Sequence, residues 1–198
     1  MRIAVLTFEG FNELDSFVAA GVLNRLRGQG WLAEITAPTA SVTSMNGVRV
    51  QAQQPLEFAN EADVVLFGSG ILTRDIARDS ALLARLRLDP ARQLVGSQCS
   101  GALLMARLGL LGGIPACTDL TTKPWVIEAG VEVLDQPFFA RGNLATAGGC
   151  LSAPYLAAWV IARLAGEAAC AEALHYVAPV GEKAFFVERA LGVIRPYL

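Results

Sequence analysis

The stretch QLVGSQCSGALLMARLGLL, residues 93–111, decides the fold class of this sequence. It opens with a short apolar run of the kind that forms a buried strand, and from Ser100 onward apolar residues recur at three- and four-residue spacing. The helical spacing starts at once, so no loop separates the two patterns. Cys99 is therefore predicted to lie on a tight turn between a strand and a helix, flanked by small residues.

Strand patterns and helix patterns keep alternating along the rest of the chain. Residues 62–67 form a continuous apolar run, which is typical of a central parallel strand buried on both faces. Residues 42–51 alternate around an Asn-Gly dipeptide, which favours a small antiparallel hairpin. Further strands are predicted at 3–8, 31–36, 93–97 and 143–147, and helices at 14–26, 73–88, 100–111, 150–165 and 167–176. This order predicts an α/β protein with a mostly parallel sheet and helices on both faces.

Composition limits the classes of partner. The chain has 198 residues, of which 54% are hydrophobic and 17% charged, and no linker or repeat divides it, so we expect one domain over 1–198. A net charge of -2 provides no basic surface for nucleic acid or an anionic membrane. The longest uncharged apolar stretch, 151–162, is too short to span a bilayer, and the N-terminus shows no export signal. We expect a cytoplasmic protein that binds a small molecule.

The cysteines and the single histidine argue against a metal centre. Cysteines at 99, 117, 150 and 170 match no zinc-site spacing and form no Cys-x-x-Cys pair, so neither a metal nor a cofactor is expected. Three of them, Cys117, Cys150 and Cys170, lie in apolar surroundings and are assigned to the core. His175, on a late helix, is assigned to the surface or to packing. Cys99 is the exception.

The position of Cys99 favours a chemical role. Ligands of doubly wound sheets bind at the carboxyl ends of the strands, and a cysteine on a strained strand-to-helix turn there has the logic of a nucleophile elbow. Such a turn predicts a positive φ at Cys99, and the nearby helix N-terminus predicts a lowered thiol pKa. The alternative is a buried cysteine in a turn that Gly101 merely permits.

Three segments taken together resemble the ThiJ/PfpI superfamily, whose domain is related to class I glutamine amidotransferases. They are QCSGALL at 98–104, GLLGG at 109–113 and NLATAGG at 143–149. Within the superfamily, the Cys-Ser-Gly-Ala elbow and the early Leu14-Asp15 pair are most similar to isocyanide hydratases and to the sensor-like domains of some transcription regulators. The resemblance implies a flavodoxin-like sandwich, a usually dimeric protein and a nucleophilic role for Cys99.

The resemblance also assigns a role to Asp15, which matches an acid at the first strand-helix junction of the family. A carboxylate beside a thiolate raises one of the two pKa values, because like charges at contact distance disfavour each other. Asp15 is therefore expected to be protonated, to donate a hydrogen bond to the Cys99 sulfur and to act as general acid or base. The alternative is a helix N-cap. The nearby Glu9 and Glu13 are expected to be solvated.

The segment Gly68-Ser69-Gly70 lies where the family usually has Pro-Gly-Gly, whose amides help to form an oxyanion hole. The amide of Gly70 or Ile71 is a candidate to join that of Ser100 in stabilising negative charge. Because one glycine is replaced and the proline is lacking, a plain turn is the alternative.

Histidine is missing from the positions where protease-like and deglycase-like branches usually carry it. Position 100 is serine, and Asp119 stands where a downstream histidine is expected. A Cys-His dyad for amide hydrolysis cannot be assembled from the motif, whereas Ser100 matches a threonine of the hydratase branch that orients water or a substrate nitrogen. Trp125, Phe138 and Phe139 are assigned either to the pocket border or to the core and interfaces.

The resemblance therefore favours a cofactor-free lyase that converts an isocyanide and water into an N-substituted formamide, with Cys99, Asp15 and Ser100 as catalytic residues. One alternative is a non-catalytic small-molecule or redox sensor with Cys99 as an oxidisable thiol. A further alternative is glyoxalase-like, deglycase-like or amidase-like activity. A homodimer is expected, because 54% apolar content leaves more hydrophobic surface than one core absorbs.

Overall fold

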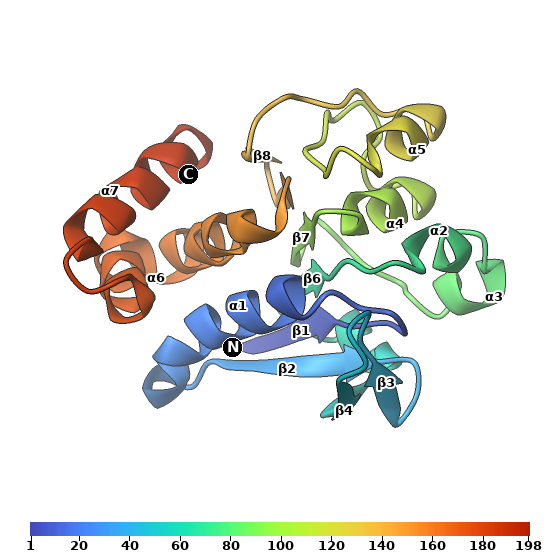
Figure 1. Cartoon of the computed structure of the whole chain (residues 1–198), viewed down its shortest axis with the longest axis horizontal. Helices are drawn as coiled ribbons and strands as arrows, with labels where there is room; N and C mark the ends of the chain where they lie inside the picture. The colour runs from blue at the N-terminus through green and yellow to red at the C-terminus, as the bar shows by residue number, and fades with distance from the viewer.

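A computed structural model describes residues 1–198 and contains one seven-stranded sheet flanked by helices (Figure 1). The strand order is β5-β2-β1-β6-β7-β9-β8, and every neighbouring pair is parallel except β8 with β9. The α/β flavodoxin-like class is thus confirmed. The strands are β1 Arg2–Leu6, β2 Leu32–Ala37, β5 Gln54–Pro55, β6 Val64–Phe67, β7 Leu94–Gln98, β8 Phe138–Arg141 and β9 Leu144–Ala147.

Helices cover both faces of the sheet. One face packs against α1 (Glu13–Leu23), α6 (Ala153–Val177) and α7 (Lys183–Ile194), and the other carries α2 (Thr73–Ile76), α3 (Ser80–Leu83), α4 (Gly101–Arg107) and α5 (Lys123–Glu128) (Figure 1). Successive strand residues point to opposite faces, so Val64 and Leu66 join the first core cluster while Val65 and Phe67 join the second. This double burial explains the apolar run at 64–67, whereas Asp63, inside the predicted range, is exposed just before β6.

Several predicted elements differ in detail from those observed. The helix predicted at 73–88 is two short helices, because the Asp79 side chain accepts a hydrogen bond from Leu82 N at 2.9 Å and starts α3 there. The break predicted between 165 and 167 is confirmed, since Gly166 has φ 87° and interrupts α6. The hairpin is also confirmed, with β3 (Ser41–Thr43) antiparallel to β4 (Arg49–Gln51). Four strands and α-helices, β5, α5, β8 and α7, have no counterpart among the predicted ones.

The remaining assignments outside the site concern single residues and short turns. Cys117 and Cys170 are fully buried, as predicted, and His175 is exposed on α6. Phe138 and Phe139 pack edge-on against Tyr197. None of the helices combines the length and the apolar character that crossing a membrane requires. Short 3₁₀ helices complete the chain: η1 Asn24–Gln29, η2 Leu56–Asn60, η3 Cys150–Ser152 and η4 Arg195–Tyr197.

A close approach of backbones brings the carboxyl ends of β6 and β7 together. A Cβ atom on Gly101 would lie 2.7 Å from the carbonyl oxygen of Phe67 and 2.8 Å from that of Gly68. Neither oxygen belongs to a flexible side chain that can move away. Glycine at position 101 therefore allows the start of α4 to pack directly on the end of β6, next to Cys99.

We predict that Gly101→Ala lowers the free energy of unfolding by about 1–3 kcal/mol, because the added methyl group displaces backbone. Gly192→Ala is the matched control: nothing lies within 4 Å of a Cβ built there, inside α7. That change should raise stability by about 0.5–1 kcal/mol, since alanine is the better helix former. Urea denaturation measures both values, and equal effects of the two substitutions would contradict the prediction.

Candidate active site

Cys99 lies at a strained junction between β7 and α4. Its φ of 45° makes it the one non-glycine residue with a positive φ, as predicted for a nucleophile elbow. Its amide donates to Ala147 O at 2.8 Å, and its carbonyl accepts from Thr118 Oγ1 at 2.8 Å. Both backbone groups are therefore held by neighbouring segments, and the side chain is only 3% exposed.

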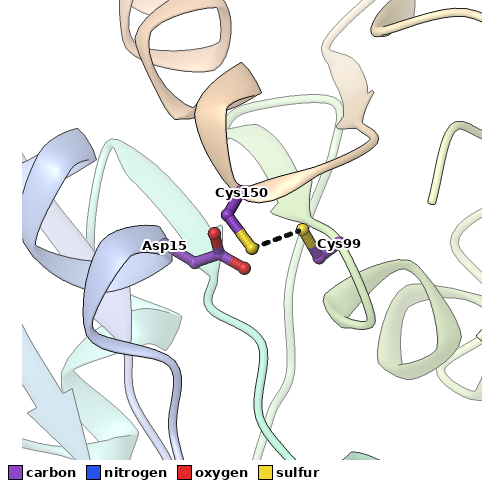
Figure 2. A group of neighbouring side chains, drawn as sticks. All are labelled: Asp15, Cys99 and Cys150. Carbon is purple, nitrogen blue, oxygen red and sulfur yellow. Dashed lines mark hydrogen bonds between the residues drawn. The ribbon is translucent and has the colours of Figure 1, made fainter. Parts of the chain in front are cut away.

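Asp15 occupies the first turn of α1 and points toward the elbow (Figure 2). The N-cap of this helix is Asn12, whose Oδ1 accepts a hydrogen bond from Leu14 N at 3.1 Å. The alternative of Asp15 as a cap is therefore wrong. The carboxyl group is buried, Oδ2 accepts a hydrogen bond from Ser69 Oγ, and Oδ1 has no hydrogen-bond partner.

Cys150 is the site residue that sequence reasoning missed. Its assignment to the core was wrong: it is half-buried at the start of η3, and its sulfur lies 3.9 Å from that of Cys99 (Figure 2). Asn12 Nδ2 donates to the Cys150 sulfur at 3.2 Å. Its position in the sequence could have indicated this, because Cys150 follows the strand pattern at 143–147 and the carboxyl ends of parallel strands lie at the same sheet edge as Cys99.

A carboxyl oxygen of Asp15 and the two sulfurs lie within 4.8 Å of one another. The Asp15 carboxyl group lies near the Cys99 sulfur and interacts with it, as expected, while its short hydrogen bond is to Ser69 and the Cys99 sulfur faces Cys150. Two sulfurs and one carboxylate oxygen are donors that a thiophilic metal ion accepts. These three residues are thus the group that could hold a metal, although the sequence predicts none.

Burial controls the ionisation of both acids. Desolvation raises the pKa of Asp15, and a hydrogen bond from Ser69 opposes this rise. Burial, and then the charge of Asp15, raise the pKa of the Cys99 thiol far above its usual range. The lowered thiol pKa predicted from the helix N-terminus is therefore wrong, because α4 is short and desolvation outweighs its dipole. At rest Cys99 keeps its proton, and Asp15 is the stronger acid of the pair.

Ser100 ties the elbow to the turn after β6. Its hydroxyl accepts from Gly70 N at 3.2 Å and shares a hydrogen bond with Thr73 Oγ1 at 2.8 Å. The amide of Ile71 donates to Gly10 O at 3.0 Å. The expectation that the Gly70 or Ile71 amide is open to a substrate is thus not met, since both are already engaged. The Ser100 amide has no acceptor among the hydrogen bonds of the structure.

A cavity of about 350 Å³ opens above Cys99. Asp119 and Trp125 line it; the carboxylate of Asp119 accepts from the amides of Thr121 and Thr122 and is held in place. Glu9 and Glu13 lie outside the lining and accept hydrogen bonds from the β3–β4 segment. The other lining residues are Asn12, Met45, Ser69, Gly70, Ile71, Cys99, Ser100, Thr121, Thr122 and Cys150.

Residues 1–163 match the DJ-1/PfpI family. The chain belongs to this family. No curated protein matches the sequence. Among solved structures, Schizosaccharomyces pombe DJ-1 is 15% identical with a TM-score of 0.76, covering 90% of this chain and 100% of that one. Drosophila melanogaster DJ-1beta is 21% identical with a TM-score of 0.77, covering 88% and 96%. A cysteine-to-alanine mutant of a DJ-1 superfamily protein from Salmonella typhimurium is 25% identical with a TM-score of 0.77, covering 89% and 98%.

The buried carboxyl of Asp15 should cost stability at neutral pH. Its pKa is raised in the folded state, so between the unfolded and the folded pKa the folded chain binds more protons, and stability falls as pH rises. Asp15→Asn should therefore raise the free energy of unfolding at pH 7 by about 1 kcal/mol, the lower end of the cost of a buried polar atom without a partner.

Urea denaturation at pH 7 and pH 4 measures this effect, and the gain should shrink at pH 4, because lowering the pH protonates more of a carboxyl group whose pKa is raised. Asp135→Asn is the control, because Asp135 is exposed and forms no ion pair. A loss of stability in Asp15→Asn that is the same at both pH values would contradict the prediction.

Proposed function

We propose that this member of the DJ-1/PfpI family is a cofactor-free, cysteine-dependent enzyme that hydrates isocyanides to N-substituted formamides. The observation that carries the proposal is the buried thiol of Cys99, fixed on a left-handed elbow beside one buried carboxyl group. No histidine lines the cavity, and Asp15 is the carboxyl group that lies beside the two sulfurs, so the proposal gives proton transfer to Asp15. An isocyanide carbon accepts both a nucleophile and a proton, which matches one thiol and one carboxyl group.

In the proposed first step, Asp15 takes the thiol proton while the Cys99 sulfur bonds to the terminal isocyanide carbon. Asp15 then returns the proton to that carbon, which gives a thioimidate. Water then adds to the thioimidate carbon, and the carbon-sulfur bond breaks. The two protons of the water end on the formamide and on the regenerated Cys99 thiol. Two acids whose pKa values are both raised suit this exchange, because one proton passes between them without leaving a charge pair in a buried site.

The walls of the cavity support a small substrate with an apolar substituent. Met45, Ile71 and Trp125 supply apolar surface to the lining, and Asp119 and Thr121 add polar groups to it. Within the proposal, Ser100 is a catalytic residue: its free amide stabilises charge on the substrate and its hydroxyl, now bonded to Gly70 and Thr73, orients water.

The sensor alternative rests on the same geometry. A thiol that keeps its proton at rest is a slow nucleophile, so Cys99 in a closed site also suits a protein that binds a small molecule without turnover. Glyoxalase-like, deglycase-like and amidase-like reactions are included in the test as competing activities.

We expect formamide formation from a panel of alkyl and aryl isocyanides, measured by liquid chromatography. Cys99→Ser should lower kcat/KM at least about 1,000-fold because it removes the nucleophile, and Asp15→Asn about 100-fold or more because it removes the acid-base group. Cys170→Ser is the matched control, since its sulfur faces Ala158 O at 3.4 Å inside the core and a hydroxyl can replace it.

Methylglyoxal and small amides are assayed in the same panel. Turnover of one of these in place of isocyanides would reassign the activity. Saturable binding of an isocyanide, seen as a shift in melting temperature, without any product would replace the enzyme proposal by the sensor.

We also propose a cytoplasmic homodimer. Leu14 and Phe17 on α1 are 48% and 39% exposed, and Leu151, next to Cys150, is 81% exposed. Because α1 contacts η3, these apolar side chains lie on neighbouring elements beside the site, and a second copy would cover them. The four cysteines are free thiols, which suits a reducing compartment.

Light scattering at micromolar concentration should therefore give the mass of a dimer. Leu151→Asp should shift it toward the monomer, whereas Val180→Asp, at a 92% exposed position in the α6–α7 loop, should not. A monomeric wild-type protein would refute the dimer.

A further inference from the structure

Cys150 takes part in no step of the proposed hydration, yet its sulfur lies close to that of Cys99. The two sulfurs are 3.9 Å apart, and Cys117 and Cys170 lie elsewhere in the core (Figure 2). A disulfide has a sulfur-sulfur bond of about 2.05 Å, so side-chain movements of roughly 2 Å in total would join them. We propose that Cys150 and Cys99 form a reversible disulfide, in which Cys150 is the residue that reacts first with a hydroperoxide.

The backbone around the pair is held at a fixed spacing. Cys99 N donates to Ala147 O at 2.8 Å, three residues before Cys150, and β7 pairs with β9 up to Gln98 and Ala147. The side-chain amide of Gln98 also donates to Gly149 O at 3.2 Å. These bonds bind the elbow to the segment that carries Cys150, so joining the two sulfurs requires no large movement of the chain.

The surroundings of the two sulfurs differ, and the difference decides the order of reaction. Cys150 is half-buried and lines the cavity, whereas Cys99 is 3% exposed. The Cys150 sulfur also receives two hydrogen bonds, from Asn12 Nδ2 at 3.2 Å and from the Cys99 thiol at 3.9 Å. The partly exposed position of Cys150 on the cavity admits the oxidant, and the hydrogen bonds that its sulfur receives stabilise negative charge there. We therefore expect Cys150 to react first and Cys99 to resolve.

The reaction balances with a hydroperoxide as oxidant. The Cys150 thiolate attacks the distal peroxide oxygen, the O–O bond breaks, and the leaving alkoxide takes up the proton that Cys150 released, which leaves a sulfenic acid. The Cys99 sulfur then bonds to the Cys150 sulfur, the S–O bond breaks, and the hydroxyl leaves as water with the Cys99 proton, carried by Asp15. Two thiols and one hydroperoxide become one disulfide, one alcohol and one water, and a dithiol reverses the change.

This inference does not depend on isocyanide hydration, because it needs no substrate. The disulfide would block the nucleophile of any reaction at the elbow while protecting Cys99 from irreversible oxidation. The test therefore measures the oxidation state of the thiols and not turnover.

The experiment treats the wild-type protein with hydrogen peroxide after chelation of metals. We expect the free thiols under denaturing conditions to fall from four to two, the intact mass to fall by two hydrogen atoms, and a peptide pair linking Cys99 to Cys150 to appear. Dithiothreitol should restore all four thiols. Absence of this linked pair, or linkage through Cys117 or Cys170, would overturn the proposal.

Two serine variants test the order of reaction. In Cys99→Ser, dimedone should trap a sulfenic acid on Cys150. In Cys150→Ser, Cys99 should be oxidised at least about tenfold more slowly than Cys150 is in Cys99→Ser, because the Cys99 thiol is buried and protonated. The opposite order of rates would show that Cys99 reacts first and would overturn the assignment.

Asn12→Ser isolates the contribution of the amide. Serine keeps a capping oxygen for α1, carries no charge and lacks the amide that reaches Cys150. Oxidation of Cys150 should slow several-fold, with an unchanged circular dichroism spectrum as evidence of folding. An unchanged rate would overturn the activation of Cys150 by the Asn12 amide.

Discussion

The left-handed backbone of Cys99 is the constraint on which the site depends. The side chain on this backbone faces Cys150 (Figure 2), and the conformation persists because the amide and the carbonyl are each bonded to another segment. Gly101 allows α4 to begin against the end of β6, since a Cβ there would collide with two carbonyl oxygens. The direction of the Cys99 sulfur is thus set by backbone contacts before any side-chain chemistry begins.

Desolvation is the second determinant of the site, and it opposes the formation of a thiolate at Cys99. A carboxyl oxygen without a partner and a buried thiol within the same small site each favour the neutral form of the other. Both groups are therefore held toward their neutral forms by the same burial. Under the proposed function, the thiol would react when a substrate accepts the proton together with the sulfur, which limits the electrophiles that suit it.

The sequence predicted the fold and the elbow because both depend on local pattern. Apolar runs identified the central strands and helical spacing identified the helices. Small residues around Cys99 identified the turn. The helix at 73–88 was predicted too long, because the apolar spacing continues through the point where Asp79 starts a new helix. The contact between Asn12 and Cys150 could not be predicted from local pattern, since it depends on the packing of α1 against η3. The thiol pKa was predicted with the wrong sign because burial is a property of the assembled core.

The hydrogen bond between Asn12 and Cys150 joins residues 138 positions apart in the sequence. Contacts of such separation close large loops and form late in folding, because the entropy of loop closure is lost before the contact stabilises anything. During synthesis, Cys99 leaves the ribosome well before its partner sulfur exists. The Cys99 thiol therefore passes through a period without the neighbours that bury it, and the length of that period depends on how fast residues up to 150 are translated and folded around it.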